Sequence, residues 1–400
     1  MRSFPILYLL IFLIFYLLIT IGANKNLIRL FSENKRKLIN WIFWSINLFI
    51  LIGFIFLYIY PYNAREASNY PAYFYFNSLL FADIIFKIPL SLSLLLYYLF
   101  FKLRQRKSVL YSGLVISIGL IITILYGLVI GNQNLRVRNY ELEFKNLPEE
   151  FNNYKIAQIS DLHLGSWLSS NKLLNRTANK IENIKPDLFL FTGDMVNNYA
   201  HETDGWIEYF NRMTAGIPSF AILGNHDYGD YTNWEGEKQK TQNFRKLLQS
   251  MENMGFDILR NEDVVLRKGN DSIYLAGVEN WGHAPFPQYA DLEKAMQNVT
   301  DSAFTILMTH DPAHWESKVK HMNEINLTFS GHTHGLQWGF KPAGIAFSFS
   351  YLTRKNWSGL YRFDDSALIV NAGLGTIGIP WRIEMPPEIT IVTLKRLKIN

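Results

Sequence analysis

The chain has 400 residues, of which 49% are hydrophobic and 18% charged, and it contains no cysteine, which excludes disulfides and thiolate metal sites. Its formal net charge is +5, from 39 Lys and Arg against 34 Asp and Glu. Up to Glu150 the balance is 15 against 7, which leaves 24 against 27, so the positive charge belongs to the first part of the chain and gives no support for a nucleic-acid partner.

The first part of the chain contains four apolar stretches, each long enough to cross about 30 Å of hydrocarbon as a helix. They are Pro5 to Gly22, Ile39 to Tyr60, Tyr75 to Phe101 and Val109 to Ile130. The alternative for the first stretch is a cleaved signal peptide, because Arg2 precedes it and small residues follow it, but Ile21 stands where a small residue is preferred. We therefore expect a transmembrane domain of four helices over residues 1–131.

The short loops between these stretches differ in positive charge. Five Lys or Arg lie between the first and second stretches and four between the third and fourth, whereas Arg65 is the only cation between the second and third. Lys and Arg are enriched in cytoplasmic loops, so the two basic loops are predicted to face the cytoplasm. With four spans, everything after Ile130 would then lie on the outer side of a cell membrane.

The third stretch carries two charges, Asp83 and Lys87, which lie four residues apart and so share one helix face. Charges at membrane depth are costly and indicate a functional role, such as a proton or ion path. The alternative is a mutually neutralising pair that fixes helix packing, and we favour it. The sequence leaves the role of the pair open.

Residues 132–150 are polar with mixed charge and are predicted to be a linker, so that a second domain covers residues 151–400. Apolar stripes at helical spacing predict a helix that ends before Pro186 and another that runs from about Thr241 to Gly255. These helices alternate with short runs rich in β-branched residues. Such alternation is typical of α/β layers.

Five apolar runs of this second domain each end in Asp, Asn or His. The polar segments that end or follow them are Asp161-Leu162-His163, Gly193-Asp194, Gly224-Asn225-His226-Asp227, His310 and Gly331-His332-Thr333-His334. An α/β sheet gathers polar groups at the carboxyl ends of its strands, so we expect these segments to meet. Oxygen and imidazole ligands without sulfur suit Mn²⁺, Fe or Zn²⁺. The sequence therefore predicts a metal-dependent active site.

The ordered segments resemble the motif series of the calcineurin-like metallophosphoesterases, which reads D-x-H, G-D, G-N-H-D/E, a lone H and G-H-x-H. The series covers roughly Ile156 to Gly335. The context His310-Asp311-Pro312 and the tail from Asn371 to Thr390 are similar to the YkuE-like branch of that family. The resemblance implies an α/β fold, a sandwich of two β-sheets flanked by helices. It does not cover the membrane part.

The resemblance also implies two divalent metal ions, Mn, Fe or Zn. One ion would be held by Asp161, His163, Asp194 and His334, and the other by Asp194, Asn225, His310 and His332. Asp194 would then bridge the two ions. A pair of ions can lower the pKa of water and neutralise charge on phosphoryl oxygens. His226 would be the catalytic residue, contacting the phosphate and protonating the departing oxygen.

Two departures from the family patterns limit these implications. Protein phosphatases of the superfamily read G-D-x-x-D-R-G, whereas here Asn197 and Asn198 replace the acid and the arginine, which argues against phosphoprotein substrates. We expect the Asn197 amide to accept a hydrogen bond from His226 instead, and Asn197 and His283 are candidate substrate-binding residues. Leu336 stands where YkuE-like chains usually have Gly and would narrow the pocket.

Two classes of function are open. The first is a membrane-bound phosphodiesterase or pyrophosphatase with a dinuclear metal site, acting on an envelope lipid or lipid-linked nucleotide, with phosphomonoesterase activity as the alternative. The second is a membrane transport or sensor protein centred on Asp83 and Lys87, with a regulatory soluble domain. The complete ligand set favours the enzyme. The sequence indicates no protein partner.

Overall fold

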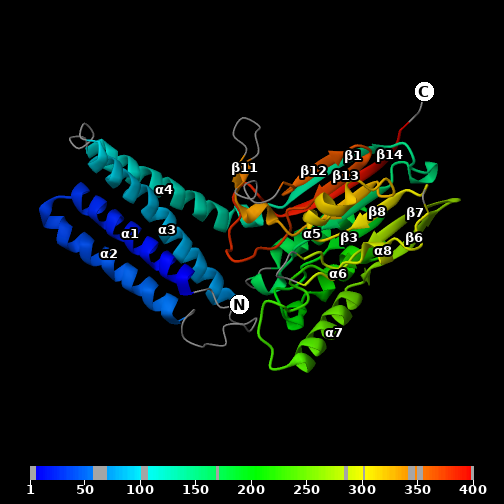
Figure 1. The fold of residues 1–400 in the computed structure, drawn as a ribbon, viewed down its shortest axis with the longest axis horizontal. Coiled ribbons are helices and arrows are strands. Elements are labelled where there is room, and N and C mark those ends of the chain that lie inside the picture. The colour runs from blue at the N-terminus through cyan, green and yellow to red at the C-terminus, as the bar shows by residue number, and fades with distance from the viewer. Residues whose placement is uncertain are drawn as a thin grey trace. The chain divides into compact units, whose positions relative to one another are not determined.

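The computed structural model of the chain describes residues 6–56, 70–100, 107–167, 171–282, 287–300, 302–340, 347–348 and 355–397. The chain divides into two compact units (Figure 1). The helical unit comprises Met1–Val129 with Gly378–Trp381, and the sheet unit comprises Ile130–Ile377 with Arg382–Asn400.

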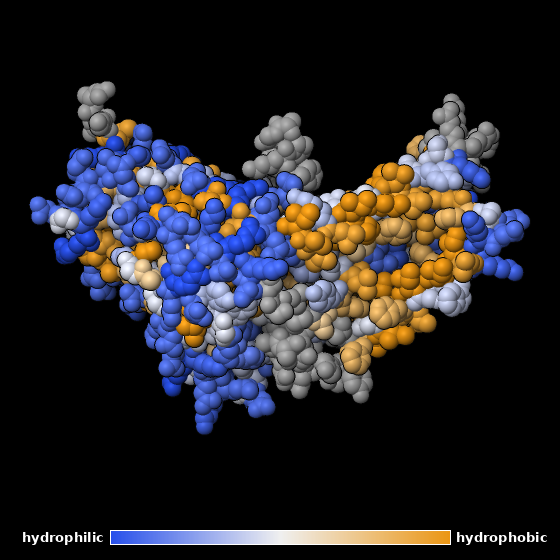
Figure 2. All heavy atoms as spheres, turned by 180° about the vertical axis from the view of Figure 1, so that it is seen from behind, coloured by the Kyte–Doolittle hydropathy of each residue, from blue (hydrophilic) through white to orange (hydrophobic). Residues whose placement is uncertain are grey.

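The helical unit contains α1 (Ile6–Leu30), α2 (Glu33–Phe54), α3 (Tyr70–Leu99) and α4 (Lys107–Val129). All four are long and apolar enough to cross a membrane. Apart from Leu336, every exposed large hydrophobic side chain of the described residues lies between Leu7 and Ile130. Figure 2 shows this apolar surface over the helices. Such a continuous apolar surface fits hydrocarbon rather than water.

The two charges of α3 lie in a closed polar cluster between helices. Lys87 is fully buried, and its ammonium donates to the Asp83 carboxylate, to Asn47 Oδ1 at 2.6 Å and to the Tyr16 hydroxyl at 2.9 Å. An ammonium has three donors, so these three acceptors from α1, α2 and α3 use all of them. The Tyr16 hydroxyl also donates to Asp83 at 2.8 Å.

The sheet unit is built on two six-stranded sheets, ordered β1-β14-β2-β3-β4-β5 and β12-β13-β9-β8-β7-β6. The first contains β1 (Arg136–Phe144), β2 (Lys155–Ile159), β3 (Leu188–Thr192), β4 (Ser219–Ile222), β5 (Asp257–Ile258) and β14 (Glu388–Arg396). The second contains β6 (Glu262–Lys268), β7 (Asp271–Gly277), β8 (Thr305–Met308), β9 (Leu327–Ser330), β12 (Gly359–Phe363) and β13 (Ser366–Val370). A separate pair, β10 (Gly339–Phe340) and β11 (Phe347–Ser348), is antiparallel. The expected two-sheet architecture is confirmed.

The main core of the sheet unit lies between the two sheets, where Ile156 and Leu190 of the first sheet belong to the same buried cluster as Ile306 and Phe329 of the second. A second cluster joins the first sheet to α5 (Lys172–Ile184), α6 (Ile207–Thr214) and α7 (Glu237–Asn253). Two short helices, α8 (Leu292–Ala295) and α9 (Pro312–His314), complete the unit. The buried runs β2, β3 and β4 are parallel neighbours, as are β8 and β9, so their carboxyl ends align.

Residues 132–150, which we expected to be a linker, instead contain β1. This strand pairs in parallel with β14 over nine residues, from Arg136 opposite Glu388 to Phe144 opposite Arg396. Leu142 and Phe144 are buried in the core between the sheets. Because β1 is an edge strand with one exposed face, its sequence alternates with charged residues and has the composition of a polar connector. The sheet therefore begins well before residue 151.

Candidate metal centre

The motif segments follow the carboxyl ends of β2, β3, β4, β8 and β9, as the parallel arrangement requires. Three groups of side chains have potential ligand atoms within 4.8 Å of one another: Asp161, His163 and His334; His163, Asp194 and His226; and Asp194, His310 and His332. Asp194 belongs to two of the groups. The structure thus brings together the acidic and imidazole side chains that the sequence predicts.

The carboxylate of Asp194 lies at the middle of the cluster. Its Oδ2 is 3.2 Å from His310 Nε2 and 3.5 Å from His163 Nε2. His163 Nε2 is in turn 3.1 Å from His334 Nε2, which lies 3.3 Å from Asp161 Oδ1. Carboxylate oxygens and imidazole nitrogens that converge at these distances are the donor atoms that bind divalent cations in proteins.

Two hydrogen bonds orient ligand atoms toward the centre. His310 Nδ1 lies 2.7 Å from the Thr192 carbonyl, which can only accept, so Nδ1 carries a proton and a neutral His310 ring would have its lone pair on Nε2, the atom that faces Asp194. The Asn225 amide nitrogen donates to the Tyr231 hydroxyl at 2.8 Å. Asn225 Oδ1 is buried without a hydrogen-bond partner in the described part of the chain. A buried oxygen of this kind fits a metal ligand.

The pKa shifts divide the imidazoles of the cluster. Burial opposes protonation of His310, but the Asp194 carboxylate outweighs it and raises the pKa of His310 to about 10. Burial lowers the pKa of His163 to about 3 and that of His334 well below its ordinary range, so both keep lone pairs for a cation. Burial opposes ionisation of Asp194, but His310 and His226 outweigh it and hold the pKa of this carboxyl well below its usual value. Burial raises the pKa of Asp161 to about 6.

Five of the seven expected ligands have a left-handed backbone. Their φ angles are 51° for Asp161, 47° for His163, 60° for Asp194, 71° for His332 and 49° for His334. This conformation costs an L-residue about 1–2 kcal/mol, and such strain is found at functional sites. The left-handed residues turn the chain sharply at the strand ends.

Two motif glycines permit close approach to the carboxylates. A Cβ on Gly224 would lie 2.2 Å from Asp194 Oδ1, and one on Gly331 would lie 2.3 Å from Asp161 Oδ2. Both distances are far below van der Waals contact, so any side chain at either position would displace a carboxylate. The glycines of these motifs are therefore required by the geometry of the site.

His226 is half-buried beside the expected ligands. Its backbone N–H donates to Asp194 Oδ1 at 2.9 Å, and its Nδ1 lies 2.8 Å from the Asn197 carbonyl oxygen. We expected the side-chain amide of Asn197, rather than its backbone carbonyl, to accept the hydrogen bond from His226. The Asn197 amide instead pairs with Ser166 Oγ, at 3.0 Å and 3.2 Å, and the residue is only 2% exposed. His283, the other substrate-binding candidate, lies outside the described residues.

Two buried acids that sequence reasoning missed hold the loops of the site. The Glu202 carboxylate accepts backbone N–H groups of Gly165, Asn197, Asn198 and Tyr199 at 2.5–3.0 Å. The Asp227 carboxylate accepts four others, including those of Gly224 and Asp194 at 2.8 and 2.9 Å. Burial raises the pKa of Asp227 to about 7. Asp227 was visible within its motif, whereas no short pattern marks Glu202.

A third missed residue, Arg382, is fully buried next to a ligand. Its Nη2 lies 3.3 Å from His334 Nδ1, and its Nη1 donates to the carbonyls of Ala372 at 3.0 Å and Met385 at 2.9 Å. Burial lowers its pKa to about 10. The arginine therefore fixes the carboxyl-terminal tail against the metal centre.

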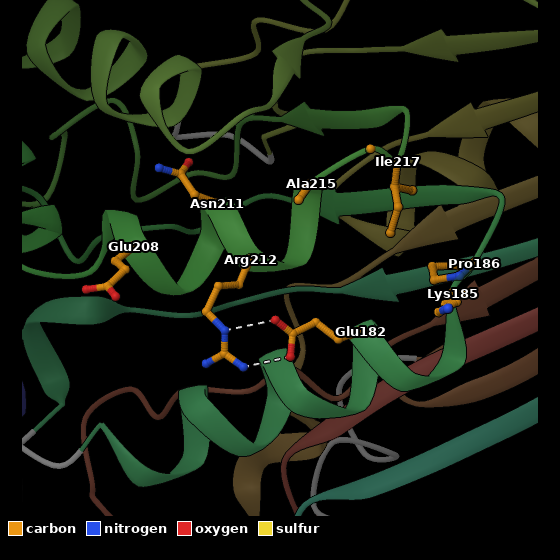
Figure 3. Close-up of a pocket in the computed structure, with 9 residues that line it drawn as sticks. Glu182, Lys185, Pro186, Glu208, Asn211, Arg212, Ala215 and Ile217 are labelled. Carbon is orange, nitrogen blue, oxygen red and sulfur yellow. Dashed lines mark hydrogen bonds and ion pairs between the residues drawn. The ribbon is translucent and has the colours of Figure 1, made fainter.

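A surface hollow between α5 and α6 is a separate feature (Figure 3). Arg212 and Glu182, which line it, form two hydrogen bonds of 2.9 and 2.7 Å. Lys185 and Ile217, also in its lining, precede β3 and β4, whereas the expected ligands follow those strands. The hollow thus lies at the edge of the sheet opposite to the metal centre.

The fold and the donor set define a metal-dependent phosphoric ester hydrolase. The sequence profile of the calcineurin-like phosphoesterases matches residues 154–336. The Bacillus subtilis metallophosphoesterase YkuE is 30% identical over 254 residues, which cover 62% of this chain and 82% of that protein. The chain belongs to the calcineurin-like metallophosphoesterase family, as its motif series led us to expect.

The names of two other relatives refer to a membrane and to a lipid-linked substrate, respectively. A transmembrane protein with metallophosphoesterase domain from Danio rerio is 30% identical over 279 residues, which cover 68% of this chain and only 60% of that protein. The UDP-2,3-diacylglucosamine pyrophosphatase LpxG of Chlamydia trachomatis is 27% identical over 299 residues, which cover 62% of this chain and 86% of that protein.

Proposed function

We propose that this chain is a membrane-bound phosphodiesterase or pyrophosphatase that uses two divalent cations and hydrolyses an envelope lipid or a lipid-linked nucleotide. The observation that carries the proposal is the position of Asp194, whose Oδ2 lies within 3.5 Å of imidazole nitrogens from two different ligand groups. A carboxylate shared in this way suits a bridge between two ions. The name of the Chlamydia trachomatis relative supports a lipid-linked pyrophosphate as the substrate.

The ligand sets that we propose are those expected from the motifs. Asp161, His163, Asp194 and His334 would hold one ion, and Asp194, Asn225, His310 and His332 the other. Mn²⁺, Fe or Zn²⁺ suits these donors. When bound, the ions would lower the pKa of water and neutralise charge on the phosphoryl oxygens. The chain itself supplies the shape of the site through its left-handed turns and the buried carboxylates of Glu202 and Asp227.

His226 is the proposed general acid. Because a carbonyl only accepts, the bond from Nδ1 to Asn197 places the proton of the neutral ring on Nδ1 and leaves Nε2 as the atom that can gain and deliver a second proton. Delivery to the departing oxygen would leave the ring neutral again. His226 also belongs to one of the groups that could hold an ion, and the metal content of a His226 variant distinguishes the two roles.

The proposed catalytic domain includes β1, which begins at Arg136, and follows a transmembrane domain of residues 1–131. We propose that it faces the outside of the cell membrane, because nine Lys or Arg lie at or near the helix ends assigned to the cytoplasm, where α1 is followed by α2 and α3 by α4, and one lies between α2 and α3 in the sequence. A reporter that is active only after export should be active when fused after Asn400. Activity of a cytoplasm-only reporter at that position would reverse the orientation.

The transport or sensor alternative finds less support. A proton or ion path needs an exchangeable group, whereas every ammonium donor of Lys87 already has an acceptor within the helical unit. The cluster fits a packing role, in which one buried charge ties three helices together. Phosphomonoesterase activity is the second candidate within the enzyme class, because the same metal centre can bind a terminal phosphate.

The test uses the full chain in detergent, stripped of metal and then loaded with Mn²⁺, Zn²⁺ or Fe²⁺. Hydrolysis of bis(p-nitrophenyl) phosphate should appear only after loading and should exceed hydrolysis of p-nitrophenyl phosphate. Asp194→Asn should lower turnover by more than about a thousandfold, because it removes charge from both ions. Full activity of this variant with metal still bound would contradict the two-ion assignment, and a preference for the monoester would establish the alternative activity.

A further inference from the structure

The backbone immediately after the ligand His334 has an unusual conformation. Four consecutive residues, His334 to Gln337, have φ angles of 49°, 55°, 51° and 57°, and only Gly335 among them is a glycine. L-residues enter this region singly and at a cost, so a left-handed turn of four is strained. The turn must be held by its surroundings.

Gln337 anchors the end of this turn. Its side-chain nitrogen donates to the Ile377 carbonyl at 3.1 Å, and its side-chain oxygen accepts the Ile377 N–H at 2.7 Å. Its backbone carbonyl accepts the Ile383 N–H at 2.8 Å. At the start of the turn, the Leu336 N–H donates to the Thr333 carbonyl at 2.9 Å. The position of Leu336 is therefore fixed from both sides.

A leucine at position 336 does not stabilise the folded state. Its side chain is 48% exposed, and it is the one exposed large hydrophobic residue among the described residues beyond Ile130. A glycine would adopt its φ of 51° without strain and would remove the apolar surface from water. Neither backbone preference nor burial explains a leucine here, two residues after a metal ligand.

We propose that Leu336 is a specificity-determining residue that contacts the hydrocarbon chain of an amphiphilic phosphoester whose phosphate lies at the metal centre. This inference rests on the proposed function and names the part of the substrate that the ligands do not contact. A cationic centre, two residues from an apolar side chain on a backbone that is held at both ends, matches a molecule with a phosphate joined to a hydrocarbon group. The strain is then retained because it keeps the leucine at the surface, two residues after a proposed ligand, rather than in the core.

The experiment measures kcat/KM of the metal-loaded full chain for p-nitrophenyl methyl, butyl and hexyl phosphates in one detergent. Each buried CH₂ contributes up to about fourfold, so the wild type should favour the hexyl ester. Leu336→Gly should lose about fivefold to tenfold on the hexyl ester and less than about twofold on the methyl ester. Partition of the ester into detergent is the same for both proteins and cancels in their ratio.

Two further variants isolate the apolar contact. Leu336→Met keeps a flexible apolar side chain of similar volume and should retain most of the hexyl preference, whereas Leu336→Gln keeps the length and should lose it. Lys185→Gly is the matched control for strain, because Lys185 has a φ of 48° at the end of α5, on the far edge of the sheet. It should leave the hexyl-to-methyl ratio unchanged.

The outcomes separate this inference from the proposed function. If the metal-loaded wild type did not hydrolyse the methyl ester, the proposed phosphodiesterase function would be contradicted. An equal loss on methyl and hexyl esters in Leu336→Gly would mean that the residue acts through His334 and would overturn the hydrocarbon contact. An effect seen only with substrate embedded in phosphatidylglycerol vesicles, and absent with the dissolved hexyl ester, would overturn it as well, in favour of contact with the bilayer surface.

Discussion

The side-chain amide of Asn225 donates a 2.8 Å hydrogen bond to the hydroxyl of Tyr231, and the ring of Tyr231 stacks on His226 with 4.4 Å between ring centroids. One tyrosine thus contacts a proposed metal ligand and the proposed general acid. The bond directs the amide nitrogen of Asn225 toward the hydroxyl, which leaves Oδ1 for a cation.

Tyr231→Phe should weaken binding of one of the two ions by about tenfold to a hundredfold, the usual cost of removing a group that orients a ligand. The ring still stacks on His226, so turnover at saturating metal should change much less. Metal titration followed by elemental analysis measures the affinity. Tyr209→Phe is the matched control, because it removes an equivalent bond from the Asn171 amide, at 2.6 Å, outside the metal centre. Equal metal affinity in the two variants would contradict the orienting role.

His226→Ala should keep both ions and slow turnover of the diester by about a hundredfold to ten-thousandfold, because it removes the proton donor without removing a ligand. Elemental analysis of the purified variant decides the point. A variant with one ion per chain instead of two would show that His226 is a ligand. The dependence of the rate on the leaving group is a second check. His226→Ala should slow hydrolysis least for an ester with an acidic leaving group, because that group needs protonation least.

His314 should make the protein less stable in acid. It is fully buried, its Nδ1 lies 3.0 Å from Thr309 Oγ1, and burial lowers its pKa to about 4. The unfolded chain gains the proton near pH 6.5, so the stability from neutral His314 is complete above that pH and is lost as the pH falls toward 4. The free energy of unfolding should fall by up to about 1.4 kcal/mol per pH unit more steeply in the wild type than in His314→Gln. If the free energy of unfolding changed equally with pH in the wild type and in His314→Gln between pH 7.5 and 5, this contribution of His314 would be excluded.

In the helical unit, removing only the charge of Lys87 should destabilise the protein more than removing the charges of both Asp83 and Lys87. Lys87→Met leaves Asp83 without its cation in a side-chain environment that is only 11% exposed. Breaking a buried pair costs about 3–5 kcal/mol, whereas replacing both partners by apolar residues is often neutral. The double variant Asp83→Leu, Lys87→Met should therefore unfold in detergent at a higher temperature than Lys87→Met. A double variant that is folded but inactive toward a lipid substrate would point to a functional role for the pair.

Much of the protein is determined by local sequence. The four apolar helices follow from composition over about 20 residues, because crossing hydrocarbon depends on each segment by itself. The site residues follow from motifs at strand ends, because buried parallel strands are short apolar runs and the polar residue after each run lies at the same edge of the sheet. Asp161, Asp194 and His334 could thus be placed near one another before the structure was known.

Other features were decided only by tertiary structure. Strand β1 is a strand because β14, about 250 residues later in the chain, pairs with it, and its alternating residues do not reveal that partner. Glu202 and Arg382 became part of the site only when loops distant in sequence closed around them, since a buried charge is stable only where several groups bond it at once. The contact between His226 and the carbonyl of Asn197, rather than its side chain, was decided in the same way, because Ser166 takes up the amide.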